Sequence, residues 1–187
     1  MYQYEIKIPK DRIAVLIGTK GKVKKEIEAN TKSKLKVDSK EGDIFIVGDD
    51  SLGLMTAKDV IQAIGRGFNP EIALALLKPD YCMEIVDISD YSRNTKKDMI
   101  RLKGRAIGAG GKAIKTIEFL TETNISVYGK TIAIIGEIER VNLAKRAVEN
   151  ILQGSPHSKV YSWLENKRKE LRMEAILGRE IEAKRGK

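Results

Sequence analysis

Two glycine-and-lysine turns are the parts of this chain whose residue types and spacing could do chemistry. Residues 18–37 read GTKGKVKKEIEANTKSKLKV and residues 108–127 read GAGGKAIKTIEFLTETNISV, and at an offset of 90 they agree at 8 of 20 positions. Chance would give about one or two matches, so the chain contains a duplicated unit. In both copies a four-residue turn begins and ends in glycine and leads into lysine and a helical pattern. Such a turn is suited to holding phosphate.

The physical basis lies in the start of the helix that follows the turn. Its first amide groups have no acceptor within the helix, and the helix dipole adds partial positive charge there. Glycine lets the chain turn sharply and removes side chains that would keep a sugar-phosphate backbone away. Lys20 and Lys22 add full charge in the first copy, and Lys112 does so in the second. Together these features predict an anion site at a helix terminus.

The spacing separates this turn from other phosphate-binding turns. A mononucleotide P-loop needs glycine five residues before the Gly-Lys pair, but Leu16 and Ala106 stand there. A dinucleotide fingerprint follows a strand of a parallel sheet, whereas this turn follows a helical pattern. The remaining arrangement is a G-x-x-G turn between two helices, as in KH domains. In those domains the turn clamps about four nucleotides of single-stranded nucleic acid.

The charge distribution points to the same kind of partner. The net charge is +9 with a pI near 9.5, which favours a polyanion. Residues 93–115 hold eight basic side chains against one acid, and residues 20–40 hold eight lysines against three acids. A merely solvated surface would explain the abundance of charge but not its gathering around both turns. Aromatic residues are only 5%, so stacking platforms of the RRM type are not evident.

The elements that must position the turns follow from the apolar patterns. In both copies the order is strand, helix, turn, helix, strand, strand, helix. The expected first-copy elements are 4–8, 12–17 with Asp11 as N-cap, 22–31, 34–38, 43–48, and 52–66 with Ser51 as cap. In the second copy we expect a strand over 82–88, a longer basic helix from about Thr95, a strand over 132–136 and a helix over 138–153.

The two copies resemble KH domains of the eukaryotic (type I) topology. IPKDRIAVLIGTKGKVKKEIEANTKSKLKV resembles the KH core along its full length, and GRAIGAGGKAIKTIEFLTETNISVYG resembles it from Gly104. The resemblance implies an α+β protein with two tandem type I KH domains, each a three-stranded antiparallel sheet with three helices, plus a C-terminal helix. The expected division is 1–67 first KH domain, 68–79 apolar helical connector, 80–154 second KH domain and 155–187 basic C-terminal helix or tail.

Two further segments accompany the units. Residues 71–77 are too apolar for a free linker and should pack between or beneath the domains. The trailing segment should form a helix docked by one side, through residues such as Val160, Trp163 and Leu164, that frays after Gly178.

The second unit, with its basic insertion and trailing basic helix, resembles the partner-of-Nob family of archaeal and eukaryotic small-subunit ribosome-assembly proteins. That resemblance implies binding to small-subunit ribosomal RNA near its 3′ end, in ribosome assembly or translation, and contact with the processing machinery there. An alternative is an adaptor that recruits an rRNA-processing or translation protein, with RNA binding secondary. Residues 71–77 and Trp163 could form its surface.

The KH resemblance also assigns the two sides of each groove. In the first copy it implies RNA contacts at Ala14, Val15, Ile17, Gly18, Thr19, Lys20, Gly21, Lys22, Lys36 and Val37. In the second copy it implies contacts at Gly104, Arg105, Ile107, Gly108, Ala109, Gly110, Gly111, Lys112, Ser126 and Tyr128. The second turn departs from the pattern because its two central residues are not basic. Its charge comes instead from neighbouring residues, so we add Arg101, Lys103 and Lys115.

Composition argues against other classes of function. One cysteine, Cys82, excludes a disulfide framework and a cysteine-rich zinc site, and one histidine, His157, leaves little material for acid–base catalysis. Asp49 and Asp50 form the only paired carboxylate in an obvious turn and are more simply a helix cap. We therefore expect no enzymatic activity, no metal and no cofactor. With no apolar signal core and no membrane-length run, we expect a cytoplasmic protein whose partners are single-stranded RNA and ribosome-assembly or translation proteins.

Overall fold

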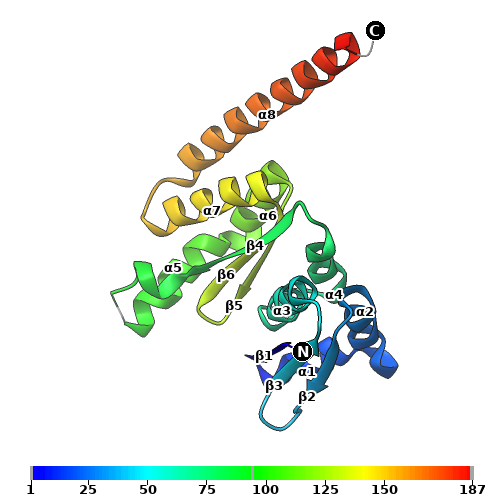
Figure 1. The fold of residues 1–187 in the computed structure, drawn as a ribbon. Coiled ribbons are helices and arrows are strands. Elements are labelled where there is room, and N and C mark those ends of the chain that lie inside the picture. Colours follow the sequence, from blue (N-terminus) through cyan, green and yellow to red (C-terminus); the bar gives the residue numbers. More distant parts are fainter. Residues whose placement is uncertain (1, 94, 186–187) are drawn as a thin grey trace.

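The structure is a computed structural model that describes residues 2–93 and 95–185, with side chains described as far as Leu177. The first unit contains β1 (Tyr2–Lys7), α1 (Lys10–Ile17), α2 (Lys22–Thr31), β2 (Lys34–Val37), β3 (Asp43–Gly48) and α3 (Ser51–Gly65). The second contains β4 (Tyr81–Asp87), α5 (Lys96–Ile107), α6 (Lys112–Thr121), β5 (Asn124–Tyr128), β6 (Thr131–Glu137) and α7 (Ile138–Leu152). Between them lie α4 (Pro70–Ala73) and a 3-10 turn over Leu74–Leu77, and α8 (His157–Arg185) ends the chain (Figure 1).

The same topology occurs twice. The antiparallel sheets have the orders β1-β3-β2 and β4-β6-β5, so the last strand of each unit lies in the middle. Ile6 pairs with Ile44 in the first sheet, and Val86 pairs with Ile132 in the second. Because side chains alternate along a strand, every second residue of β3 faces the helices, and Ile44 and Ile46 are fully buried there. The predicted α+β class with two three-stranded antiparallel sheets and a C-terminal helix is confirmed.

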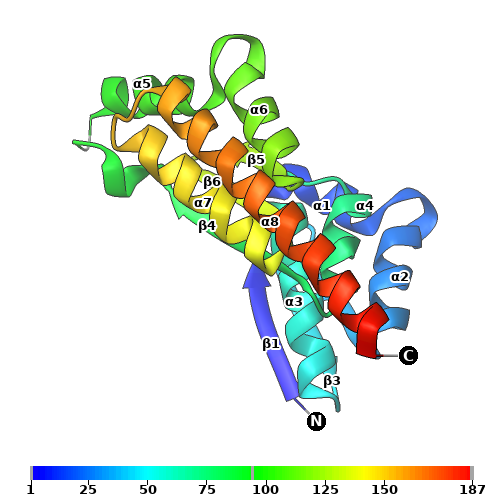
Figure 2. The ribbon, with the colours of Figure 1, turned by 90° about the horizontal axis from the view of Figure 1, so that it is seen from above.

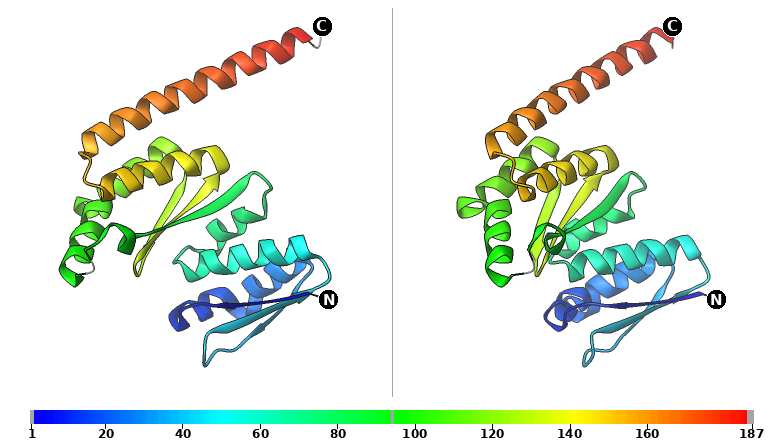
Figure 3. Two further views of the ribbon diagram at one scale, coloured as in Figure 1. Left: turned by 60° about the vertical axis from the view of Figure 1, so that its left-hand side comes forward. Right: turned by 90° about the vertical axis from the view of Figure 1, so that its left-hand side faces the viewer.

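The second sheet is covered on both faces. Along β6 every residue from Thr131 to Gly136 is buried. Ile132 and Ile134 face the core of their own unit, whereas Ala133 and Ile135 join the core of the first unit. The layers α8, α7, second sheet, α3 and first sheet therefore follow one another through the molecule (Figure 3).

The apolar connector packs between the units, as predicted. Ala73 is fully buried and Leu76 is 8% exposed, and both belong to the cluster that includes Ala133 and Ile135 of β6. The connector is shorter in helix than expected, because α4 gives way to a 3-10 turn at Leu74 before Pro79. Ile72, Leu74 and Leu77 are partly buried against the same cluster, so packing removes much of the segment's apolar surface from water.

Three local expectations about helix ends were wrong. Asp11 is not the N-cap of α1. Pro9, with φ of −57° that already suits a helix start, holds that position, and Asp11 lies in the first turn. The cap of α3 is Asp50, whose carboxylate accepts a hydrogen bond from the Leu52 amide at 3.1 Å. Helix α8 continues past Gly178 to Arg185, because the roughly 1 kcal/mol cost of one glycine is small beside the propensity of its Glu-, Lys- and Ala-rich neighbours.

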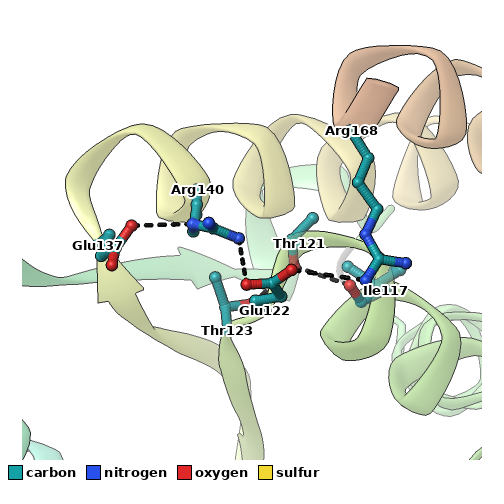
Figure 4. Close-up of polar contacts among 7 residues, drawn as sticks. All are labelled: Ile117, Thr121, Glu122, Thr123, Glu137, Arg140 and Arg168. Atoms are coloured by element: carbon teal, nitrogen blue, oxygen red, sulfur yellow. Dashed lines mark hydrogen bonds and ion pairs between the residues drawn. The ribbon is translucent and has the colours of Figure 1, made fainter. Parts of the chain in front are cut away.

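Helix α8 is anchored to the second unit by a cluster of charges (Figure 4). Glu122, which ends α6 with φ of 55°, lies 2.6 Å from Arg140 of α7 and 3.5 Å from Arg168 of α8. Val160 and Leu164 of α8 are buried against the second unit, where α8 runs beside α7 (Figure 2). The second half of α8 extends away from both units (Figures 1 and 3). The matching residue in the first unit is Lys32, with φ of 50°, and in the described part of the chain no trailing helix packs beside it. None of the helices in the described part of the chain combines the length and apolar character needed to cross a bilayer.

Candidate nucleic-acid interface

The two glycine turns share one backbone conformation. In the first turn φ is 70° at Gly18, 54° at Lys20 and 76° at Gly21. In the second turn the matching values are 74° at Gly108, 59° at Gly110 and 76° at Gly111. Lys20 therefore adopts a left-handed conformation that costs a non-glycine residue roughly 1–2 kcal/mol. The fold maintains this conformation in both copies even where the residue at the strained position differs.

The glycines of each turn serve two different purposes. A Cβ at Gly18 would lie 2.5 Å from Cγ2 of Val23, and a Cβ at Gly108 would lie 2.7 Å from Cβ of Ala113. The first glycine therefore allows the turn to close against the next helix. At Gly110 and Gly111 a Cβ would meet no atom within 4 Å, so the surface beyond them is open. A sugar-phosphate backbone can approach the second turn closely from that side.

The helix that follows each turn keeps its positive end available. The N-cap residues Gly21 and Gly111 provide no side-chain hydrogen bond, and neither α2 nor α6 has an acidic residue in its first turn. Helix N-termini are normally satisfied by a Ser, Thr, Asp or Asn side chain. Because α2 and α6 have no such capping side chain, their first amide groups and the positive end of the helix dipole are available to an external anion.

One face of α5 forms the helical wall of the second groove. Ile107 and Lys103 lie four residues apart on this face, and Gly104 lies beside them. Gly104 is exposed and a Cβ there would touch nothing within 4 Å, although glycine inside a helix costs about 1 kcal/mol. Packing does not require this glycine, so its effect is to keep the helix backbone accessible. The matching position in α1 is Ala14, which is also small and exposed.

The opposite wall is the edge strand, which two repeated side chains hold in place. Glu28 accepts a hydrogen bond from the Leu35 amide at 2.7 Å, and Glu118 accepts one from the Ile125 amide at 2.8 Å. The repeated threonines act nearby: Thr31 bonds Ser33 and Thr121 bonds Thr123, both at 2.8 Å. Aligning the two copies shows that Glu28 matches Glu118 and Thr31 matches Thr121, but it does not show what these side chains do. They fix the strand edge relative to the helix, and so the width of the groove.

Arg105 has a structural role that the sequence did not reveal. Its Nε donates to the Ile151 carbonyl at 2.8 Å and its Nη2 donates to the Ser155 carbonyl at 2.6 Å. It thereby satisfies carbonyls at the end of α7, as Arg12 does for Ile64 and Phe68 at the end of α3. The guanidinium expected to contact RNA is thus engaged within the protein.

Ser126 and Tyr128 lie between the two units. Ser126 Oγ donates to the Arg66 carbonyl at 2.8 Å, and the Tyr128 hydroxyl donates to the Asp11 carboxylate at 2.8 Å. The hydrogen bond to Asp11, with burial, raises the pKa of Tyr128. These outward-facing residues of β5 therefore brace the strand against the first unit, so the groove of the second unit has a wall supported by both.

The remaining predicted residues divide by exposure. Val15, Ile17 and Val37 pack against the first core and Ile107 is half-buried. Arg101 is held at 2.7 Å by Asp98, and Lys103 Nζ donates to the Gly129 carbonyl at 3.3 Å. The exposed members at the turns and walls are Ala14, Thr19, Lys20, Lys22, Lys36, Gly104, Ala109, Gly110, Lys112 and Lys115. Within the described residues no three His, Cys, Asp or Glu side chains are placed to share a metal ion.

Two sheet-and-helix units, each with a G-x-x-G turn between its first two helices, define a tandem protein of the type I KH class. The KH domain model matches residues 3–63, and the model described as eukaryotic type KH-domain (KH-domain type I) matches residues 82–169. KH domains bind single-stranded nucleic acid and carry no catalytic machinery of their own. The class is therefore a binding one rather than an enzymatic one.

Comparison with known proteins narrows the class. A KH domain-containing protein of Methanocaldococcus jannaschii is 49% identical over 89% of this chain and 74% of its own length. The RNA-binding protein pno1 of Drosophila melanogaster is 38% identical over 60% of this chain, which spans 47% of that protein. The Dim2p chain in a crystal structure of an a/eIF2alpha–Dim2p–rRNA complex from Pyrococcus horikoshii superposes with a TM-score of 0.82 at 43% identity, covering 90% of this chain and 95% of that one. This chain belongs to the Dim2p and PNO1 family of tandem KH-domain proteins, as predicted.

Proposed function

We propose that this protein binds small-subunit ribosomal RNA as a single strand near its 3′ end, in the cytoplasm, during ribosome assembly or translation. The main support for this proposal is the open structure of the second groove. Its turn has open space beyond Gly110 and Gly111, its helix α6 has no side-chain cap, and Gly104 leaves the backbone of α5 uncovered. Phosphates would lie at the turn and bases between α5 and β5. The proposal is supported by the Pyrococcus horikoshii complex, in which Dim2p occurs together with rRNA.

We keep the division of the chain into a KH domain over 1–67, a connector over 68–79, a second KH domain over 80–154 and a C-terminal helix over 155–187. Within it, the exposed members of the two turns and walls make the contacts. These are Ala14, Thr19, Lys20, Lys22, Lys36, Gly104, Ala109, Gly110, Lys112 and Lys115, together with the half-buried Lys103.

The proposal is tested by filling the groove without changing charge. Gly104→Leu places a large side chain in open space on α5 and replaces glycine with a strong helix former, so the fold should be stabilised by up to about 1 kcal/mol. Asn142→Leu, on an exposed position of α7, is the matched control. Fluorescence anisotropy with a labelled single strand from the 3′ end of small-subunit rRNA should show at least a tenfold weaker Kd for Gly104→Leu and no change for the control. Equal binding by all three proteins would reject the groove as the RNA site.

A translation or ribosome-assembly protein is a second proposed partner, because the Pyrococcus horikoshii complex also contains a/eIF2alpha. In this adaptor role the protein would hold the RNA and the factor together. Co-sedimentation with purified a/eIF2alpha, with and without RNA, distinguishes the two roles. If Gly104→Leu still retains the factor while losing RNA, the protein-binding surface lies outside the groove. If the factor is retained by neither protein in either condition, the adaptor role is rejected.

A further inference from the structure

A depression of about 450 Å³ lies at the end of the second groove that is farthest from the turn. It is formed by the first half of α5 and by the short turn between β5 and β6. Lys96, Met99 and Ile100 contribute from α5, and Gly129 and Lys130 contribute from the turn. Its volume falls within the range of sites that hold small ligands.

The depression continues the groove rather than standing apart from it. On a helix, positions 96, 100, 103 and 107 lie on one face, so the depression, Gly104 and the glycine turn follow one another along α5. Lys103 lines the depression and donates to the Gly129 carbonyl at 3.3 Å, which connects the two walls at this point. A strand that leaves the turn along α5 therefore reaches the depression next.

The first unit carries a different depression at the corresponding place, of about 510 Å³, whose lining includes Lys10 and the acidic Glu41. Helix α1 has 8 residues and begins at Lys10, which matches Ile100 at the repeat offset, whereas α5 has 12 residues and begins earlier at Lys96. In the second unit the added turn of α5 and Ser89 of the preceding 3-10 turn (Ile88–Tyr91) contribute to the lining of the depression. Thr95 caps the extension by accepting from the Asp98 amide at 3.2 Å, so the added turn is a defined part of the helix.

The chemistry of the depression suits a nucleotide. Ile100 is 64% exposed, an unusual position for a large apolar side chain, and Met99 lies beside it. Lys96, Lys103 and Lys130 surround these apolar groups, and none of the described residues that line the site is acidic. The nearest acid on the helix, Asp98, is engaged with Arg101. An apolar floor can hold the face of a base while lysines contact the adjoining phosphate.

We propose that this depression is an additional nucleotide subsite, which holds the base of one nucleotide beyond the roughly four that a KH groove clamps. It rests on the proposed function, because the occupant is a continuation of the same RNA strand. A single-stranded RNA is favoured over a protein segment by the three lysines and the continuity with the groove. The subsite would let the second unit read a longer segment than the first.

The test measures how affinity depends on RNA length. Fluorescence anisotropy compares a four-nucleotide RNA with RNAs extended by one or two nucleotides at either end, using Ile100→Ser and Lys130→Gln as site variants. Met55→Ser and Lys97→Gln are controls, since Met55 is an exposed apolar residue of α3 and Lys97 lies on α5 outside the depression. The intact protein should gain about tenfold in affinity on extension at one end. The site variants should lose most of that gain while binding the four-nucleotide RNA within about twofold of the intact protein.

Crosslinking provides a second, independent readout. A photoreactive uridine at the added position should crosslink within residues 96–100, whereas the same group at the central position should not. Undiminished length dependence in Ile100→Ser and Lys130→Gln, or crosslinks only elsewhere, would overturn the subsite and leave the proposed function intact. Failure of the intact protein to bind any of the RNAs would instead count against the proposed function itself.

Discussion

The two glycine turns should contribute unequally to RNA binding, and paired aspartates can measure this. The perturbation is Ala109→Asp with Gly110→Asp in the second turn, compared with Thr19→Asp and Lys20→Asp in the first. All four positions are exposed, and a Cβ at Gly110 meets nothing within 4 Å. Lys20 already adopts φ of 54° where Gly110 has 59°, so a side chain is tolerated in this conformation at a cost of roughly 1–2 kcal/mol.

The expected magnitude follows from the site geometry. A carboxylate about 6 Å from a phosphate in water-like surroundings costs about 0.7 kcal/mol, so two cost about 1.4 kcal/mol at low salt. Loss of one amide–phosphate hydrogen bond adds about 1.5 kcal/mol. The sum is about 3 kcal/mol, or roughly a hundredfold in Kd. We expect this loss for the second turn and about tenfold for the first.

We expect the larger loss of affinity at the second turn because the second half of the chain carries the larger net positive charge. Residues 81–187 carry 21 basic and 14 acidic side chains, whereas residues 1–80 carry 14 and 12. The stronger positive field therefore surrounds the second turn, although only the first has a lysine within it.

Anisotropy titrations at about 50 mM salt measure the Kd values, and circular dichroism melts show whether each variant is folded. Asn142→Asp with Ser162→Asp adds the same two charges at exposed positions of α7 and α8 and serves as the control. The reasoning is refuted if the first-turn variant loses binding while the second-turn variant stays folded and binds normally.

Four further outcomes are expected. If the protein neutralises about four to six phosphates, log K should fall against log[salt] with a slope of about −3 to −4, and a slope near zero would show that the basic clusters are not the binding surface. Calorimetry should give a single unfolding transition because Ala133 and Ile135 of β6 belong to the first unit's core; two transitions, with isolated halves melting as in the intact chain, would contradict this. Gly108→Ala should destabilise the fold by about 2–3 kcal/mol because its Cβ would lie 2.7 Å from Ala113, whereas Gly111→Ala should cost about 1 kcal/mol, and equal shifts in denaturant midpoint would disprove the distinction. Arg105→Met should lower stability by about 1.5–3 kcal/mol through its two lost hydrogen bonds yet leave the salt slope unchanged; a shallower slope would mean that Arg105 contacts phosphate after all.

Features that depend on neighbouring residues were readable from the sequence. The G-x-x-G spacing, the repeat offset of 90 and the order of strands and helices identify two KH units, because turn geometry and apolar periodicity are local properties of the chain. The same reasoning located the helix over Lys22–Thr31 and the strand over Asp43–Gly48 at their observed bounds. The apolar connector was likewise recognisable, since a segment that cannot stay in water must be buried.

Tertiary structure decided how the side chains around the turns are used. Arg105 donates hydrogen bonds to backbone carbonyls 46 and 50 residues away, and Tyr128 donates one to a carboxylate 117 residues away. No periodicity in the sequence marks such pairs, because they depend on how finished elements pack. The docking of α8 through Glu122 and the depression beside Ile100 arise in the same way. The chain's local patterns therefore determine that it holds nucleic acid, and only long-range packing determines which basic and polar groups remain free to do so.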